Sequence, residues 1–166
     1  YTGEDTLSLH DALPIFPLSQ LHRVTGAPYI PGLDFIDFET LRKIVKTTTA
    51  MNKKYPLERH RQWLAAYFQK ETLAASLPDV SLRWIGDPVG WGVFTEREFQ
   101  EMEFIAEYSG KVRKRKKGDH KNPYCFEYLL HPDQPSPYII DAMDQGGISR
   151  YINHDFQPNL IAAFVN

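Results

Sequence analysis

An asparagine–histidine pair, Asn153 and His154, lies in the middle of a polar stretch that covers residues 149–159. An asparagine side chain offers two hydrogen-bond donors and an acceptor, and a neutral histidine offers one of each. A glycine pair precedes the stretch, Ser149 can cap a helical turn and Pro158 stops it, so the pair is expected side by side at the end of that turn. Such side chains could bind a polar ligand, or they could form a capped turn whose histidine is satisfied internally.

Four short patterns precede this stretch. Because glycine lacks a Cβ atom, the Gly90-Trp91-Gly92 pattern would let a ligand approach the backbone closely, although alone it would also suit a turn between strands. In order and separation, the whole set resembles the SET domain of protein-lysine methyltransferases, whose pattern is Gly-x-Gly, Tyr-x-Gly and Arg-Phe/Tyr-Ile-Asn-His ending in Pro-Asn. The segments that carry the resemblance are Gly90-Trp91-Gly92-Val93-Phe94, Glu107-Tyr108-Ser109-Gly110, Tyr124-Cys125-Phe126-Glu127-Tyr128-Leu129, Ile139-Ile140-Asp141-Ala142 and residues 149–159.

The resemblance covers residues 80–166 and implies transfer of a methyl group from S-adenosylmethionine to the side-chain amine of a lysine in a protein, such as a histone or another basic protein. In the family, the Gly-x-Gly backbone cradles the methionine part of the donor, a strand tyrosine packs beside it, and the Asn-His pair binds its adenine and ribose side. The cofactor-binding residues implied here are Gly90, Trp91, Gly92, Tyr124, Asn153 and His154, and the catalytic residue implied, in the lysine channel, is Tyr108.

A lysine acceptor has to be neutral, because its ordinary pKa of about 10.4 keeps it charged at pH 7. An apolar, aromatic channel disfavours the ammonium form and lowers that pKa, so that the amine becomes a usable nucleophile. The hydroxyl of Tyr108 would orient this amine toward the methyl group. No metal site is expected, because no second histidine or acid stands at ligand spacing on the turn of His154.

The chain departs from the family pattern in two places. Asp155-Phe156 stands where the family usually has Ser-Cys, which fits a branch without zinc. The 166 residues contain no Glu-Leu-x-Phe/Tyr-Asp-Tyr block, whose last tyrosine is catalytic in the family. We therefore expect a C-terminally incomplete fragment that does not methylate lysine by itself. The alternative is a non-catalytic interaction module on the same scaffold, which binds a peptide or an acidic partner.

Composition narrows the remaining classes of protein. The chain has 42% hydrophobic residues, enough for a packed core, and its net charge of −2 argues against a dedicated nucleic-acid binder. A single cysteine excludes an internal disulfide framework and a cysteine-built zinc cluster. No run is long and apolar enough for a bilayer, so no membrane partner is expected. We expect a reducing, intracellular location, in the cytoplasm or in the nucleus of a eukaryotic cell.

The N-terminal half divides into two segments. Residues 1–33 are interrupted by prolines and predict an unstructured or artefactual leader. Residues 34–78 predict a helical segment, which could recognise a partner or cover a hydrophobic face of the domain. Aromatic stripes at helical spacing are usually core, so we expect the second role. The apolar residues at helical spacing are Phe38, Leu41, Val45, Trp63, Leu64, Tyr67 and Phe68.

Residues 80–166 predict a mainly β domain, which the resemblance implies is the SET-type β-clip of small sheets, so the chain is α+β overall. Short apolar runs alternate there with glycine, proline, aspartate and asparagine. Tyr124, Phe126, Tyr128 and Leu130 are expected on one face of a strand. Strands are predicted at Leu82–Ile85, Val93–Thr95, Phe104–Tyr108, Tyr124–Leu130 and Tyr138–Asp141.

A basic run, Lys111–Lys117, follows five glutamates that lie between residues 96 and 107. The run could form a patch for nucleic acid or an acidic partner, or it could be a solvated hairpin arm that the preceding acids partly neutralise. It shows no apolar alternation to bury, and its charges repel one another. Our hypothesis is therefore that the run captures a partner and does not contribute to folding.

Overall fold

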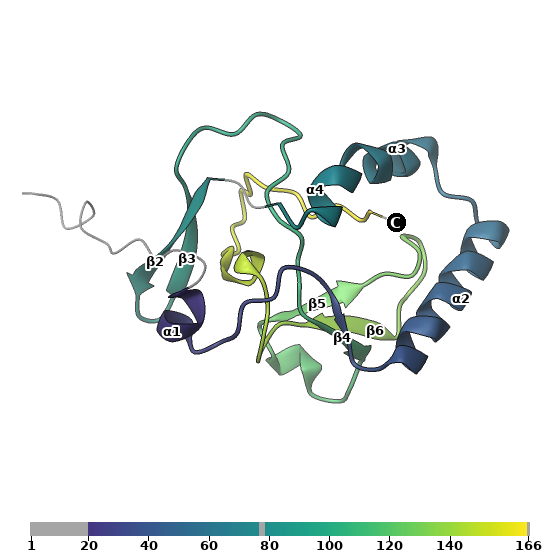
Figure 1. Ribbon diagram of the computed structural model, residues 1–166, viewed down its shortest axis with the longest axis horizontal. Helices are drawn as coiled ribbons and strands as arrows, with labels where there is room; N and C mark the ends of the chain where they lie inside the picture. Colours follow the sequence, from purple (N-terminus) through teal and green to yellow (C-terminus); the bar gives the residue numbers. More distant parts are fainter. Residues whose placement is uncertain (1–19, 77–78, 166) are drawn as a thin grey trace, which may run out of the picture.

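The computed structural model describes residues 20–76 and 79–165, and it places them in two small sheets and several helices (Figure 1). The strands are β1 (Asp34–Phe35), β2 (Val80–Gly86), β3 (Gly90–Thr95), β4 (Lys111–Lys114), β5 (Cys125–Tyr128) and β6 (Tyr138–Asp141). The larger sheet has the order β1-β4-β6-β5, and β2 and β3 form an antiparallel hairpin. Small sheets beside helices confirm the predicted α+β class.

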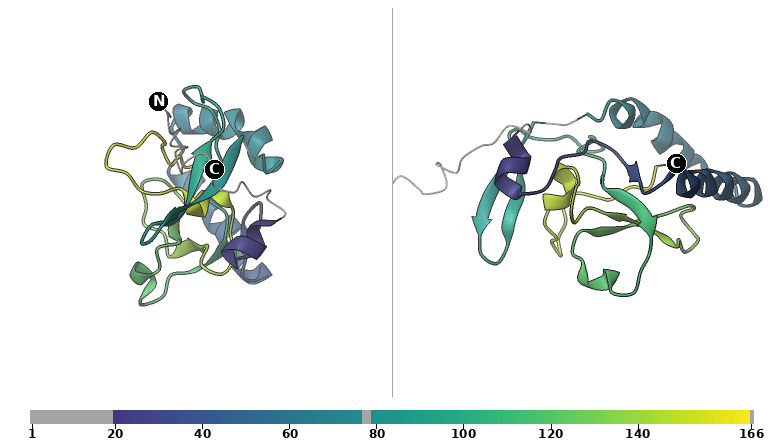
Figure 2. Two further views of the ribbon diagram at one scale, coloured as in Figure 1. Left: turned by 90° about the vertical axis from the view of Figure 1, so that its left-hand side faces the viewer. Right: turned by 60° about the horizontal axis from the view of Figure 1, so that its bottom comes forward.

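α2, α3 and α4 lie toward one end of the molecule and the β2–β3 hairpin lies at the other, with α1 beside the hairpin, as Figures 1 and 2 both show. The helical elements are α1 (Leu21–Thr25), α2 (Phe38–Lys54), α3 (Arg59–Tyr67), α4 (Gln69–Leu73) and the 3-10 turns η3 (Asp119–Lys121) and η4 (Ile148–Tyr151). Asp37 caps the N-terminus of α2, because its carboxylate accepts a hydrogen bond of 2.6 Å from the backbone N–H of Thr40. Within the described ranges, no helix is both long and apolar enough to cross a bilayer.

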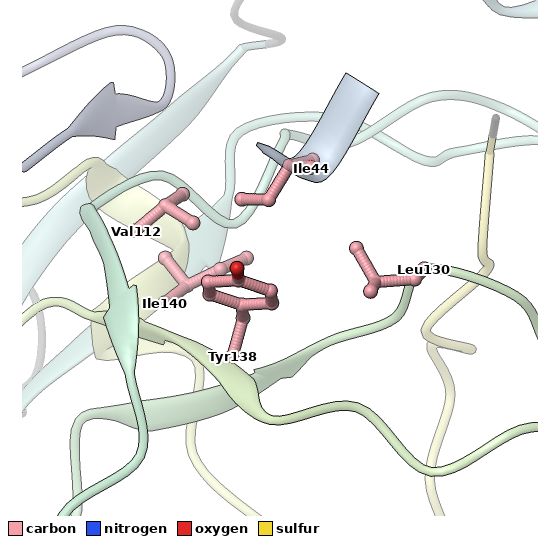
Figure 3. Close-up of a cluster of buried hydrophobic side chains, with 5 residues drawn as sticks. All are labelled: Ile44, Val112, Leu130, Tyr138 and Ile140. Atoms are coloured by element: carbon pink, nitrogen blue, oxygen red, sulfur yellow. The ribbon is translucent and has the colours of Figure 1, made fainter. Parts of the chain in front are cut away.

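The larger core lies between α2 and the four-stranded sheet (Figure 3). Ile44 of α2 packs against Val112 of β4 and against Tyr138 and Ile140 of β6, and Leu130 completes the cluster. None of these side chains is more than 8% exposed. Burial of each contributes roughly 1.5–3 kcal/mol, so this cluster fastens the helix to the sheet.

The predicted apolar face of α2 is wrong at two positions. Phe38 is 76% exposed and Val45 is 56% exposed, whereas Ile44 is buried. The sheet contacts only one side of this helix, and that side carries Ile44 together with the partly buried Met51, seven residues further on. Two helical turns separate these positions, which is why they share a face.

A second, smaller core joins the N-terminal segment to the hairpin. Leu21 of α1, Leu82 of β2 and Tyr151 of η4 are buried together, and Trp91 and Val93 of β3 pack against them. Residues 20–33, which the sequence predicted as part of an unstructured leader, therefore contribute to the packing of the domain. Residues 1–19 of that leader lie outside the described residues.

The predicted strands agree with the structure in part. β6 has its predicted limits, and β2 and β3 contain their predicted residues. The prediction of a strand at Phe104–Tyr108 is wrong, because the segment pairs with no other strand. The predicted strand at Tyr124–Leu130 is shortened to β5, and Tyr124 lies just before it, where its carbonyl oxygen accepts hydrogen bonds from the Tyr108 hydroxyl and from the Ala142 N–H.

The basic run is not a solvated arm along its whole length. Its first four residues form β4, which lies between β1 and β6, and Val112 is fully buried. Arg113 is 9% exposed, and its guanidinium donates hydrogen bonds to the carboxylates of Asp119 and Asp141. The hypothesis that the run has no role in folding is therefore wrong for Lys111–Lys114, because pairing with neighbouring strands overrides the repulsion between its charges.

Candidate functional site

The glycine motif and the Asn-His pair meet where β3 packs against η4 and the residues that follow it. A Cβ atom on Gly92 would collide with the side chain of Ile85 and would lie 3.0 Å from Nδ2 of Asn153. Gly92 is buried, and because glycine lacks a Cβ atom it lets Ile85 and Asn153 lie close to the backbone of β3. Residues that are 61 positions apart in the sequence thereby lie side by side.

η4 is held in place by the segment around Tyr108. The hydroxyl of Ser149 donates a hydrogen bond of 2.8 Å to the carbonyl oxygen of Glu107. The hydroxyl of Ser109 donates one of the same length to Ile30, and a Cβ atom on Gly147 would collide with that hydroxyl. The prediction that Ser149 caps the turn is wrong: η4 has no side-chain cap, and Ser149 lies inside it.

Tyr108 and Tyr124 are adjacent, as the motif order implies. The hydroxyl of Tyr108 donates a hydrogen bond of 3.0 Å to the carbonyl oxygen of Tyr124, and its ring lies 4.9 Å from the ring of Phe126. Burial raises the pKa of Tyr108 to about 12, so the phenol stays protonated at neutral pH. Its proton is engaged with Tyr124, and the lone pairs of its oxygen remain able to accept a hydrogen bond.

Arg150 links the two halves of the site, and the sequence reasoning assigned it no role. Its guanidinium carbon lies 4.2 Å from the ring centroid of Tyr124 and 5.1 Å from that of Tyr151, so it is held by cation–π contacts. Its Nη2 donates a hydrogen bond of 2.9 Å to Met143, whereas Nε and Nη1 are buried without a partner among the described residues. The feature of the sequence that could have identified Arg150 is its position three residues before Asn153.

The Asn-His pair is accessible to solvent. Asn153 and His154 are exposed, and neither side chain makes a hydrogen bond to another described residue. The ring of His154 lies 5.2 Å from the ring of Phe156, which is 94% exposed. The partly buried ring of Trp91 packs against the smaller core, and its centroid lies 5.4 Å from that of the Trp84 ring.

Comparison with known proteins agrees with this arrangement. The SET domain family model matches residues 90–166. Histone-lysine N-methyltransferase Su(var)3-9 of Drosophila melanogaster is 35% identical over 79 residues, which are 43% of this chain and 12% of that protein. The H3 lysine-9 specific histone-lysine N-methyltransferase SUVH5 of Arabidopsis thaliana is 36% identical over 76 residues, which are 44% of this chain and 9% of that protein. The chain thus spans about a tenth of the length of these relatives.

The crystal structure of ATXR5 in complex with histone H3.1 has a similar fold. It superposes with a TM-score of 0.57 at 18% sequence identity, over 83% of this chain and 66% of that chain. At this identity the likeness concerns the fold alone. The match to the SET domain family model thus rests on residues 90–166 of this chain.

Proposed function

We propose that the protein transfers a methyl group from S-adenosylmethionine to the side-chain amine of a protein lysine. The observation that carries the proposal is the contact of Gly92 with Asn153 inside the segment that matches the SET domain. The relatives are histone-lysine N-methyltransferases, which supports a histone as the substrate and the nucleus as the location. Since β2 pairs with β3 along its length, we place the start of the domain at residue 80.

The residues present fit the methyl donor. The backbone of β3 can be approached closely at Gly92, and the exposed amide of Asn153 and ring of His154 have donors and acceptors to offer. When bound, S-adenosylmethionine would supply the methyl group from its sulfonium. Gly90, Trp91 and Gly92 would hold its methionine part through their backbone. Tyr124 would pack beside it, held in position by the guanidinium of Arg150.

Tyr108 would orient the lysine and would not act as a base. Because its pKa is raised to about 12, the phenol is neutral at pH 7 and cannot remove a proton from the ammonium. Its oxygen accepts from the amine while its own proton stays with the Tyr124 carbonyl. The rings of Tyr108 and Phe126 provide apolar surface that favours the neutral amine. No Glu-Leu-x-Phe/Tyr-Asp-Tyr block occurs in the 166 residues, so the proposal assigns no role to such a block.

Replacing Asn153 tests the donor site. In Asn153→Ala the donor loses hydrogen-bond partners, and the affinity for S-adenosylmethionine should fall by about 1–3 kcal/mol, as measured by titration calorimetry. Asn159→Ala is the matched control, because Asn159 is an exposed asparagine in the same stretch, and it should leave the affinity unchanged. Equal affinities in wild type and Asn153→Ala would overturn the assignment of the donor site.

Replacing Tyr108 with phenylalanine tests the lysine site separately. Tyr108→Phe keeps the ring against Phe126 and removes the hydroxyl, so the fold and the donor affinity should be retained. The rate, or the number of methyl groups added to a lysine peptide, should change because one orienting hydrogen bond is lost. Mass spectrometry of the peptide, with the whole protein as the enzyme, reads both. If the donor binds but neither wild type nor variant transfers a methyl group, the domain is a non-catalytic interaction module.

A further inference from the structure

The two faces of α3 differ in a way that the core does not explain. Leu64 and Phe68 point into the protein and are 8% and 9% exposed. Trp63 and Tyr67, one residue before each of them, are 48% and 52% exposed. The expectation that this whole stripe packs as core is therefore wrong for Trp63 and Tyr67. Large aromatic side chains that gather on a solvent-facing surface mark an interaction site.

The exposed aromatic rings are already stacked. The centroids of His60 and Trp63 are 6.0 Å apart with 24° between the ring planes, and those of Trp63 and Tyr67 are 4.7 Å apart with 23°. Positions three and four residues apart lie on one face of a helix, so the backbone of α3 holds the three rings in a column. We call His60, Trp63 and Tyr67 the aromatic stack.

Positive charges surround the aromatic stack. Arg59 lies four residues before Trp63 and Lys70 lies three residues after Tyr67, and both side chains are exposed. Between Phe38 and Leu73 the chain has eight lysines and arginines against three glutamates, although its overall net charge is −2. Among the described residues of that segment, only Glu39 forms ion pairs, with Arg42 and Lys43. The remaining positive charge is therefore free to attract an anionic partner.

We propose that the outer face of α2–α4, with the aromatic stack at its centre, binds single-stranded nucleic acid. Unpaired bases are planar and can continue the column of rings, while Arg59 and Lys70, on either side of the stack in the sequence, neutralise the phosphates. This surface lies at the opposite end of the molecule from the β2–β3 hairpin, so the strand and the methyl donor can be bound at the same time (Figures 1 and 2).

The surroundings of the stack favour this partner over two others. A methylated ammonium group would also seek aromatic rings, but Arg59 and Lys70 would repel it. An acidic peptide would satisfy the positive charges, but it has no planar group at each residue to pair with the rings. A duplex would present phosphates with its bases already stacked and paired, so it would use the charges and leave Trp63 and Tyr67 without a role.

The test is fluorescence anisotropy of the full chain with labelled oligothymidine and oligouridine strands of about 15 nucleotides. The double variant Trp63→Ala/Tyr67→Ala removes the two exposed rings and should weaken binding at least about tenfold. Phe38→Ala is the matched control, because Phe38 is an exposed aromatic residue in the same basic segment but outside the stack, and its affinity should equal that of the wild type. Thermal unfolding of each variant checks that the fold is retained.

A charge variant separates stacking from electrostatic attraction. In Arg59→Ser/Lys70→Ser, the slope of log affinity against log salt should become shallower by about 1.4, because each phosphate contact with a single strand contributes about 0.7. The aromatic variant should lower the affinity at every salt concentration and leave the slope unchanged. Oligothymidine and oligouridine that bind equally would show that the 2′-hydroxyl is not read.

Three outcomes would overturn the proposal. The first is wild-type affinity in Trp63→Ala/Tyr67→Ala. The second is binding of polyglutamate as tightly as the single strand, which would identify the face as a site for acidic peptides. The third is binding of a duplex of the same length at equal affinity, which would leave charge alone as the cause. All three can be read even if the proposed methyl transfer is absent, since none depends on turnover.

Discussion

The two basic segments of this chain put their positive charges to different uses. In Lys111–Lys117, Arg113 is paired with Asp119 and Asp141 inside the fold, and Arg115 reaches Glu127 at 3.2 Å. In α2–α4, by contrast, most lysines and arginines have no acidic partner among the described residues. The difference shows that the density of positive charge along a sequence does not identify a binding surface; the position of acids on neighbouring elements does.

The register of β4 against β6 explains why Arg113, in the first of these segments, is paired inside the fold. β4 pairs antiparallel with β6, which places Lys111 opposite Asp141 and Arg113 opposite Ile139. The guanidinium of Arg113 reaches two positions along β6 to Asp141, with nitrogen–oxygen distances of 2.8 and 2.6 Å, and it also binds Asp119 of η3. Asn122 donates a further hydrogen bond of 2.9 Å to Asp141. The network therefore joins β4, β6 and the η3 loop.

The largest effect is expected for Arg113→Ala. Removing the guanidinium leaves two partly buried carboxylates without their cation, and the free energy of unfolding should fall by about 3 kcal/mol. Denaturation in urea would measure this. Arg115→Ala is the control on the same segment, because its pair with Glu127 is about half exposed, and it should lower the stability by about 1 kcal/mol or less. Equal losses of stability in Arg113→Ala and Arg115→Ala would show that the buried and the exposed arginine contribute alike to folding.

Much of the fold is predictable from the sequence where the pattern is local. Tyr138–Asp141 is a short apolar run, and it forms β6 with the predicted limits. β4 was not predicted, because Val112 is its only apolar side chain and its strand conformation depends on β1 and β6. Phe104–Tyr108 shows the converse. Its apolar residues suit a strand, but no neighbour is in place to form a ladder, and the Glu107 carbonyl instead accepts from Ser149.

The candidate site was predictable where order along the chain reflects proximity in the fold. The resemblance assigned Gly92 and Asn153 to the donor site, and the structure brings these two residues close together. It also brings Tyr108, assigned to the lysine channel, next to Tyr124. The position of Arg150 could not be inferred in this way. Its cation–π contacts need rings from Tyr124 and Tyr151, which are brought together only after the sheet and η4 have packed.

A smaller effect is expected from acid, through Asp119. The hydrogen bond from Arg113 lowers the pKa of this carboxyl from 3.8 to about 2. A group whose pKa falls on folding stabilises the fold above its unfolded pKa and loses that contribution as the pH drops through the folded value. The melting temperature should therefore decline between about pH 4 and pH 2. In Asp119→Asn it should be lower at pH 7 and should decline less over this range.

That titration also distinguishes the two basic segments. A carboxylate that holds the buried Arg113 links stability to pH, whereas Arg59 and Lys70 of α3 and α4 have no acidic partner among the described residues. Arg59→Ala should accordingly reproduce the wild-type pH profile of the melting temperature. A profile in Asp119→Asn that is as steep as the wild type between about pH 4 and pH 2 would show that another carboxyl controls the acid sensitivity.

The smallest effect is expected for Lys114→Ser/Lys116→Ser/Lys117→Ser, which removes the exposed lysines of the run Lys111–Lys117. Residue 116 contributes to the fold through its backbone N–H, which donates a hydrogen bond of 2.6 Å to Asp119, and serine keeps that donor. The free energy of unfolding should change by no more than about 0.5 kcal/mol. The affinity for a single strand should also stay within about twofold, because the proposed contact lies on α2–α4 and not on this run. A large loss of affinity with unchanged stability would show that the single strand binds to Lys114–Lys117 and not to α2–α4.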